Sequence, residues 1–187
     1  MIQGVWKESI EFHPEKRIDV ENSGGRFSSD AGLLIVRECD EHLKLTEQFA
    51  GVLEDGRGEA KHSLLSMVRQ RVYGIVAGDE DQNDHDMLRY DPIFQTVCDQ
   101  IPDDSSQALL ASQPTLSRFE NAIDVPTLFR LRELFVTQFM DSFSEPPSRL
   151  TFDLDGFDDP AHGHQQLTMF HGYYKQSQHF PLIITNA

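Results

Sequence analysis

Two carboxylates in the last quarter of the sequence, Asp153 and Asp155, are the residues best suited to carry chemistry. They stand two apart in residues 150–155, whose alternation predicts a strand, so both side chains should point to one face. Carboxylate oxygens are the ligands that Mg²⁺ prefers, and two-metal enzymes gather them from several elements. This segment supplies part of such a site, and a solvated acidic turn after an edge strand is the alternative interpretation.

Two further segments contain metal-binding residue types. His162 and His164 could bind a transition metal, but no cysteine lies nearby and no third histidine has a suitable spacing. Residues 79–84 begin like a calcium-binding loop. However, Asp84 stands where glycine is needed and Tyr90 where a bidentate glutamate is needed. We therefore expect a solvated loop between helices there.

Residues 112–121 have the pattern of a DNA-reading helix. The segment is similar to the second helix of helix-turn-helix units, which presents small hydroxyls and an arginine to the major groove. Leu116 and Phe119 would be buried. The exposed side would carry four polar contacts: Gln113, Thr115, Ser117 and Arg118. A capped surface helix without a DNA-binding role is the alternative.

The charge balance weakens any broad nucleic-acid interface. The 187 residues include 31 acidic and 16 basic side chains, a net charge of −15, whereas DNA-binding proteins usually present a basic face. Nine of the acids and one base, Arg89, lie within residues 79–104. A DNA contact is therefore expected elsewhere on the chain.

The composition predicts a folded, soluble protein. Apolar residues make up 39% and charged residues 25%, a mixture that can build a core. No apolar run is long enough for a membrane span or a signal peptide. Cys39 and Cys98 form neither a CxxC pair nor a disulfide framework, which fits a reducing cytoplasm.

The elements that would position these residues fall into three parts. Residues 1–28 read as an extended arm with short strands near residues 10–13 and 17–20, residues 29–145 as a helical region, and residues 146–187 as a strand-containing region after Pro146 and Pro147. The periodicity predicts helices over residues 30–43, 62–76 and 126–143. Residues suited to the start of a helix indicate shorter helices over residues 46–53, 92–98 and 112–121. Strands are expected over residues 150–155, 170–174 and 180–185.

Several helix ends and one helix face are also predicted. Ser28 or Ser29 would cap the first long helix, Thr46 the second and Asp124 the last, while Gly78 would end the helix over residues 62–76. The last helix carries an apolar face that we expect to be buried in the core: Leu128, Leu131, Phe135, Phe139 and Phe143.

Taken in order, these segments resemble a known family over residues 10–187. The matching words are residues 24–34, 62–64, 69–75, 81–86, 111–121, 153–160, 162–163, 170–174 and 180–182. They resemble the amino-terminal half of a bacterial insertion-sequence transposase of the DDE type, domain group 1. Several words in collinear order are far more specific than any single motif.

The resemblance implies an α+β fold, in which a mainly helical amino-terminal region precedes the first strands of a truncated RNase-H-like α/β core. It also implies DNA cleavage and strand transfer at element ends with two Mg²⁺ or Mn²⁺ ions. The first catalytic Asp maps onto Asp155, with Asp153 the second candidate, while Phe157 departs from the small hydroxylated residue usual there. The family's second Asp and its Glu would lie beyond residue 187, so we expect the chain to be inactive alone.

The resemblance further implies DNA as the partner, at the element ends and the target. Arg69, Arg71 and Arg118 become the preferred contacts, and the helical region becomes the DNA-binding and dimerising part, as a homodimer or a mixed dimer with intact transposase. A cytoplasmic, nucleoid-associated location would follow. The alternatives are a non-catalytic DNA-binding regulator or inhibitor of transposition and an acidic interaction domain unrelated to DNA.

Overall fold

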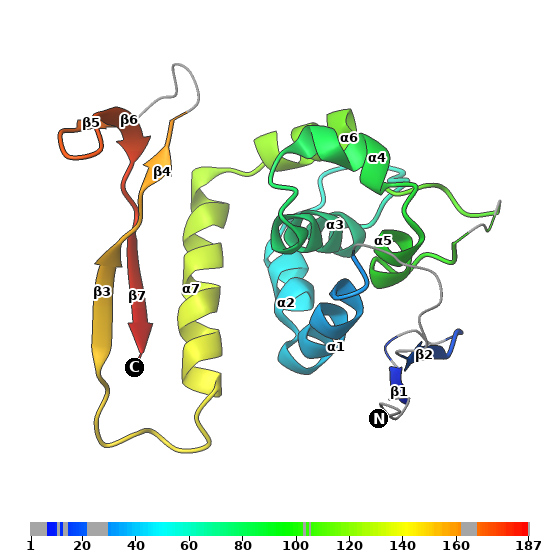
Figure 1. Ribbon diagram of the computed structural model, residues 1–187, viewed down its shortest axis with the longest axis horizontal. Helices are drawn as coiled ribbons and strands as arrows, with labels where there is room; N and C mark the ends of the chain where they lie inside the picture. Colours follow the sequence, from blue (N-terminus) through cyan, green and yellow to red (C-terminus); the bar gives the residue numbers. More distant parts are fainter. Residues whose placement is uncertain are drawn as a thin grey trace, which may run out of the picture. The chain divides into compact units, whose positions relative to one another are not determined.

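Helices dominate the first part of the chain and strands the last part, as expected for an α+β fold (Figure 1). The computed structural model describes residues 7–10, 12, 15–21, 30–102, 104, 106–161 and 168–186. Contacts divide the chain into two units, residues 1–138 and 139–187. Each is described by itself.

The first unit begins with a short antiparallel strand pair. Strands β1 (Lys7–Ile10) and β2 (Ile18–Glu21) pair with Ile10 opposite Ile18. The first strand lies earlier than predicted and the second close to its predicted position. The predicted caps Ser28 and Ser29 lie outside the described residues.

The rest of this unit is helical. The helices are α1 (Leu33–Leu43), α2 (Leu45–Val52), α3 (Leu64–Ala77), the 3₁₀ turn η1 (Gln82–Asp84), α4 (His85–Leu88), α5 (Pro92–Val97), α6 (Gln113–Asn121) and α7 (Val125–Asp141). Helix α7 ends in the second unit. None of the helices in the described part of the chain is long and apolar enough to span a membrane.

Two of the predicted helix ends are confirmed. Gly78, with φ of 95°, ends α3. Asp124 accepts a hydrogen bond from Thr127 N at 2.9 Å at the start of α7. The Thr46 prediction is wrong: Lys44 adopts a left-handed backbone (φ 55°) between α1 and α2, and Thr46 lies inside α2. Its side chain points to the interior, where it bonds to Asp40.

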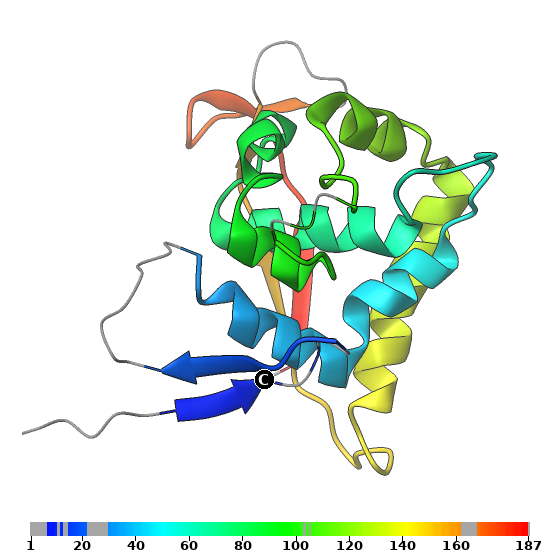
Figure 2. The same ribbon diagram turned by 90° about the vertical axis from the view of Figure 1, so that its right-hand side faces the viewer.

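The core of the first unit forms around α3 (Figure 2). One cluster joins apolar residues of α1, α3 and α5, and Phe12, Ile18 and Val20 of the amino-terminal segment pack against it. A smaller cluster joins Met67 of α3 to Leu116 of α6. Both α5 and α6 are therefore anchored to the same central helix.

The predicted core face of α7 is only partly covered. Leu128 and Phe135 are 51% and 57% exposed. Phe135 contacts Phe49 of α2 edge-on, with ring centroids 5.2 Å apart. Full burial of this face was therefore a wrong expectation, because helical spacing shows that apolar residues share a face and not what covers it.

The second unit consists of two small antiparallel sheets. Strands β3 (Phe152–Gly156) and β7 (Leu182–Asn186) form one, and β4 (Asp159–Pro160), β6 (Gln176–His179) and β5 (Met169–His171) form the other in that order. The first and last strands confirm the predictions within two residues. Strand β6 was not predicted, because its sequence Gln-Ser-Gln-His has no apolar alternation.

Candidate functional site

The two predicted metal ligands lie on β3, in the ribbon that β3 forms with β7. Asp153 pairs with Thr185 and Asp155 with Ile183. The carboxylates therefore project from one face of the ribbon, because side chains two apart on a strand share a face. Both residues are exposed, so a ligand in solution can reach them.

The end of β3 depends on a close contact with an aromatic ring. A β-carbon at Gly156 would overlap the ring of Phe180, so a larger residue there would have to displace that ring. The next residue, Phe157, donates its backbone N–H to Pro181 O at 2.9 Å. The chain therefore passes directly from Asp155 into a backbone held against the segment that precedes β7.

The two carboxylates of β3 supply only some of the ligands that a divalent ion needs. Among the residues that the structure describes, no three His, Cys, Asp or Glu side chains gather closely enough to hold a metal. Mg²⁺ is commonly held by one or two carboxylates together with substrate phosphates. Asp153 and Asp155 fit that arrangement. His162 and His164, the other metal candidates, lie outside the described residues.

The acidic stretch after α3 forms the helix-connecting structure that was expected. Asp81 accepts a hydrogen bond from Asn83 N at 2.9 Å and so caps η1. That bond holds the pKa of Asp81 below its ordinary value. The stretch then continues directly into α4.

The predicted DNA-reading segment forms α6, with its apolar side turned inward. Leu116 is fully buried and Phe119 packs against the same cluster. Arg118 is exposed, while the other three predicted contacts are half-buried: Gln113, Thr115 and Ser117. A cavity of about 560 Å³ lies beside Thr115 and Arg118 and is also lined by Arg57.

The connection before α6 is not that of a helix-turn-helix unit. Such units join their two helices by a turn of about three or four residues. Residues 98–112 separate α5 from α6, whereas residues 122–124 separate α6 from α7. The resemblance of α6 to the second helix of such a unit therefore does not extend to its connection.

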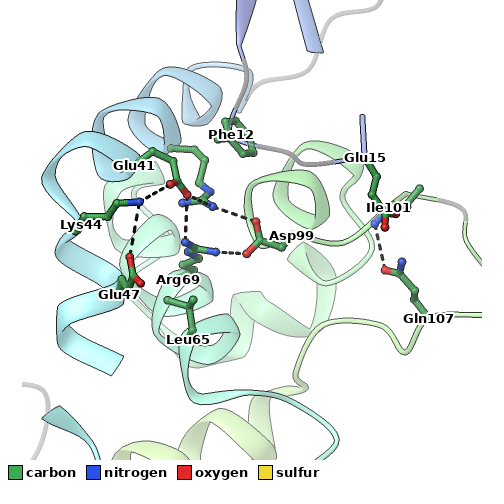
Figure 3. Close-up of a pocket in the computed structure, with 11 residues that line it drawn as sticks. Phe12, Glu15, Glu41, Lys44, Glu47, Leu65, Arg69, Asp99, Ile101 and Gln107 are labelled. Atoms are coloured by element: carbon green, nitrogen blue, oxygen red, sulfur yellow. Dashed lines mark hydrogen bonds and ion pairs between the residues drawn. The ribbon is translucent and has the colours of Figure 1, made fainter. Parts of the chain in front are cut away.

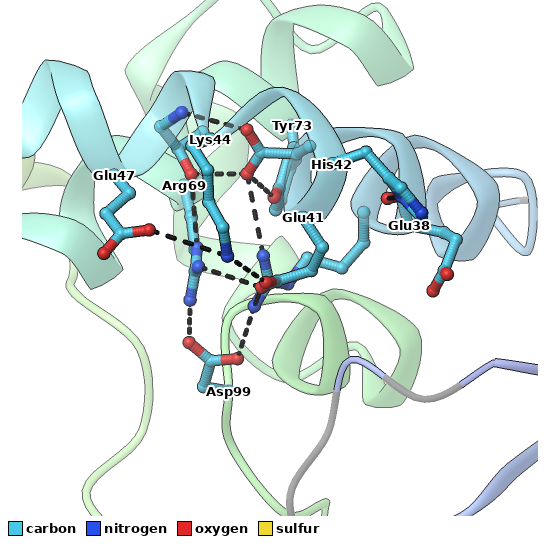
Figure 4. Close-up of polar contacts among 11 residues, drawn as sticks. Glu38, Glu41, His42, Lys44, Glu47, Arg69, Tyr73 and Asp99 are labelled. Carbon is cyan, nitrogen blue, oxygen red and sulfur yellow. Dashed lines mark hydrogen bonds and ion pairs between the residues drawn. The ribbon is translucent and has the colours of Figure 1, made fainter.

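Arg69, one of the three arginines predicted to contact DNA, is buried in α3 with 6% exposed. Its guanidinium forms an ion pair with Asp99, donates to Thr46 Oγ1 at 3.3 Å and lies 3.4 Å from Glu41 Oε1 (Figure 4). The side chain holds α1, α2 and α3 to the end of α5. A phosphate could reach it only after these contacts break.

A second buried arginine, Arg37 of α1, completes this ion-pair network. It donates to Asp99 Oδ1 at 3.0 Å and forms an ion pair with Glu41. Burial by itself would lower the pKa of Arg37, but the nearby charge of Asp99 raises it above its ordinary value. Arg37 therefore remains charged, and both arginines depend on the same carboxylate.

The neighbouring Asp40 is bound by neutral donors. It accepts hydrogen bonds from Thr46 N at 2.9 Å, from the Thr46 hydroxyl, and from Tyr73 Oη at 2.6 Å. Burial by itself would raise the pKa of Asp40, but these hydrogen bonds lower it below its ordinary value. Burial, followed by the bond to Asp40, raises the pKa of Tyr73. The tyrosine therefore stays a donor.

A cavity of about 580 Å³ opens over the ion-pair network (Figure 3). Its charged lining consists of Glu15, Glu41, Glu47 and Asp99 against Arg37, Lys44 and Arg69. Lys44 Nζ lies 2.9 Å from Glu41 Oε2 and 3.7 Å from Glu47 Oε2. Carboxylates outnumber cations, so the cavity is poorly suited to bind a phosphate.

Arg71, the next predicted DNA contact, lies on α3 with 13% of its side chain exposed. Its guanidinium forms an ion pair with Glu120 of α6, lies 2.9 Å from His85 Nε2 and donates to Glu80 O at 3.1 Å. Of the three arginines, only Arg118 is exposed. The exposed arginine among the predicted DNA contacts therefore lies on α6, whereas the two on α3 are engaged in contacts within the fold.

The buried network was missed in the sequence, although it leaves a weak signal. Arg37, Asp40 and Glu41 have the three- and four-residue spacing of helical ion pairs. Asp99 follows an apolar helix and has a left-handed backbone (φ 64°). Nothing in the local sequence links Asp99 to the residues of α1, because it lies 62 positions from Arg37.

Comparison with protein families matches residues 11–186 to the transposase DDE domain group 1. The match includes both α6 and β3 and covers nearly the whole chain. No curated protein and no solved structure matches the chain.

Proposed function

Because the chain belongs to the DDE transposases of domain group 1, we propose that it binds element-end DNA through α6 and supplies the first catalytic carboxylate from β3. The family implies DNA as the partner. The match over residues 11–186 is the observation that carries the proposal.

Asp155 is proposed as the first catalytic carboxylate, with Asp153 as the second candidate. Their shared, exposed face and the abrupt end of β3 at Gly156 support this assignment. In this proposal β3 and β7 belong to an RNase-H-like core. The two carboxylates would hold Mg²⁺ or Mn²⁺, which when bound would activate the attacking water and stabilise the leaving oxygen.

The proposed reaction is transfer at phosphorus. A water oxygen attacks the phosphodiester at the element end, the bond from phosphorus to the 3′ oxygen breaks, and that oxygen takes up a proton. The freed 3′-hydroxyl then attacks a phosphodiester of target DNA and displaces a second 3′ oxygen. The contribution of this chain is to present carboxylate oxygens to the metal on a strand accessible to DNA.

We propose that this chain alone does not complete the reaction. The described residues bring two carboxylates to the face of β3 and no group of three metal ligands. A pair of divalent ions that positions both water and leaving oxygen needs carboxylates from several elements. The remaining metal ligands would have to come from residues other than those on this face of β3.

The proposed DNA contacts are Arg118, Gln113, Thr115 and Ser117 of α6. Arg118 is exposed, and Leu116 fixes the opposite side of the helix in the core. In the sequence α6 lies outside the acidic stretch of residues 79–104, although Gln82 and Asp86 of that stretch contact the two ends of the helix. With one exposed arginine, the interface should make few phosphate contacts and depend only weakly on salt.

The test combines DNA binding with cleavage. The purified chain is titrated with the terminal sequences of its element, or with a scrambled duplex, and then incubated with Mg²⁺ or Mn²⁺. We expect tighter binding to the terminal sequence, a slope of log K against log salt of about −1 to −3, and no specific cleavage. Absence of any DNA binding at low salt would refute the role of α6.

A matched pair of variants tests the catalytic assignment. Specific end cleavage that survives Asp158→Ala but disappears with Asp155→Ala would identify Asp155 and would overturn the proposal that this chain is inactive alone. If the chain does not cleave DNA and also inhibits intact transposase, the alternative role as a non-catalytic regulator of transposition would be favoured.

A further inference from the structure

Helix α6 is held at its amino-terminal end by polar side chains from other helices. Gln70 of α3 is fully buried and bonds to both backbone groups of Ala111: it accepts from Ala111 N at 3.0 Å and donates to Ala111 O at 2.8 Å. Asp86 of α4 accepts from Gln113 N at 3.0 Å. The residues on both sides of the helix start therefore have fixed partners.

The carboxyl-terminal end of α6 is held by a second set of contacts. The Glu120 carboxylate accepts from Arg71 of α3 and from Gln82 of η1. Arg71 is itself fixed, because it also donates to Glu80 O. Since Glu120 lies two residues after Arg118, this ion pair fixes the part of the helix that carries the exposed arginine.

A buried histidine lies between the side chains that hold the two ends. His85 is fully buried, with Nε2 lying 2.9 Å from Arg71 and Nδ1 lying 3.4 Å from Gln70 Nε2. A guanidinium can only donate, so Nε2 must accept from Arg71 and the ring proton belongs on Nδ1. The Gln70 amide nitrogen is also a donor and is bonded to Ala111 O, so its approach to Nδ1 is a packing contact and not a hydrogen bond. Gly74 leaves room for the imidazole beside α3, because a β-carbon there would lie 2.7 Å from Cε1.

From this network we infer that Arg71, together with Gln70 and Asp86, is a positioning residue that sets the orientation of α6 for DNA recognition. This inference rests on the proposed role of α6. Arg71 would then affect DNA binding through Glu120 and not by contacting phosphate. Its low exposure and its three bonded nitrogens support this role.

Positioning and direct contact have different experimental consequences. Loss of a phosphate contact reduces the salt slope by about 1 and weakens binding to all sequences alike. Loss of a positioning contact misplaces the side chains of α6, so it lowers the preference for the correct sequence and leaves the slope unchanged. It should also loosen α6 in the absence of DNA.

The experiment compares Arg71→Gln with Arg118→Gln in the full chain. Hydrogen exchange of the α6 amides is measured without DNA, and affinity for terminal and scrambled duplexes is measured across a salt series. For Arg71→Gln we expect about tenfold faster exchange and a preference for the terminal sequence reduced by about tenfold, with an unchanged slope. For Arg118→Gln we expect a slope shallower by about 1 and unchanged exchange.

Two further variants keep the test decisive. Glu120→Gln retains the shape of the side chain and should reproduce the effects of Arg71→Gln, and the exchanged pair Arg71→Glu with Glu120→Arg should restore part of the lost preference. A reduced slope with unchanged exchange in Arg71→Gln would show that Arg71 contacts DNA and would overturn the inference. If no variant binds DNA, the role proposed for α6 fails, and the inferred effect on recognition fails with it. Faster exchange would then support only the contact between Arg71 and α6.

Discussion

Gly74 of α3 and His85 of α4 are so close that a β-carbon at position 74 would lie 2.7 Å from His85 Cε1 and 2.9 Å from Nε2. The imidazole has no free space, since it is fully buried between Arg71, Gln70 and the ring of Phe94. The absence of a side chain at Gly74 and the buried position of the His85 imidazole therefore depend on each other.

Gly74→Ala should destabilise the protein even though alanine is the better helix former by about 1 kcal/mol. The added methyl group must displace a buried imidazole that accepts from Arg71 and packs against Gln70 and Phe94, and overpacking of this kind costs about 1–3 kcal/mol. The free energy of unfolding can be measured by denaturant titration. Gly51→Ala in α2 is the matched control: nothing lies within 4 Å of its β-carbon, so it should be neutral or stabilising by up to about 1 kcal/mol. Equal effects of the two substitutions would contradict the contact.

The stability of the protein should fall as the pH drops from about 6.5 to 4. Burial, followed by the charge of Arg71, lowers the pKa of His85 from its ordinary 6.5 to about 4. The unfolded chain therefore takes up the proton first. The stabilisation that comes from keeping His85 neutral is complete above pH 6.5. It is lost as the pH falls through the pKa of the folded state, and the loss is on the order of 3 kcal/mol.

The measurement for this prediction is the free energy of unfolding across that pH range, for the wild type and for His85→Gln. The variant lacks the titrating group, so its stability should fall less over the same interval. Parallel pH profiles for the two proteins would show that His85 does not cause the dependence.

Asp99→Asn should destabilise the first unit by about 2–3 kcal/mol, because it leaves Arg37 and Arg69 buried without their shared carboxylate. Asparagine tolerates the left-handed backbone at this position, so the substitution changes charge with little added strain. Asp55→Asn, which removes the partner of the more exposed Arg57, should destabilise the protein much less. Similar losses in both variants by thermal or denaturant unfolding would contradict a special role of the buried pairs.

Local sequence signals determined much of the secondary structure. The spacing of apolar residues predicted α3, and the residues at its start predicted α6. Asp124 and Gly78 marked helix ends because capping depends on the residue itself and its immediate neighbours. The alternation over residues 150–155 likewise predicted β3. The polar strand β6 carries no such pattern and exists only because β4 and β5 pair with it.

The sequence by itself also determined the family, and with it DNA as the partner and Asp155 as the candidate catalytic residue. Only the tertiary structure decided which side chains each arginine contacts. The chemical type of Arg69, Arg71 and Arg118 is the same, but Asp99 lies 30 positions from Arg69 and Glu120 lies 49 positions from Arg71. Ion pairs over such separations form only when packing brings distant helices together, so local spacing could not show which arginine remains available to DNA.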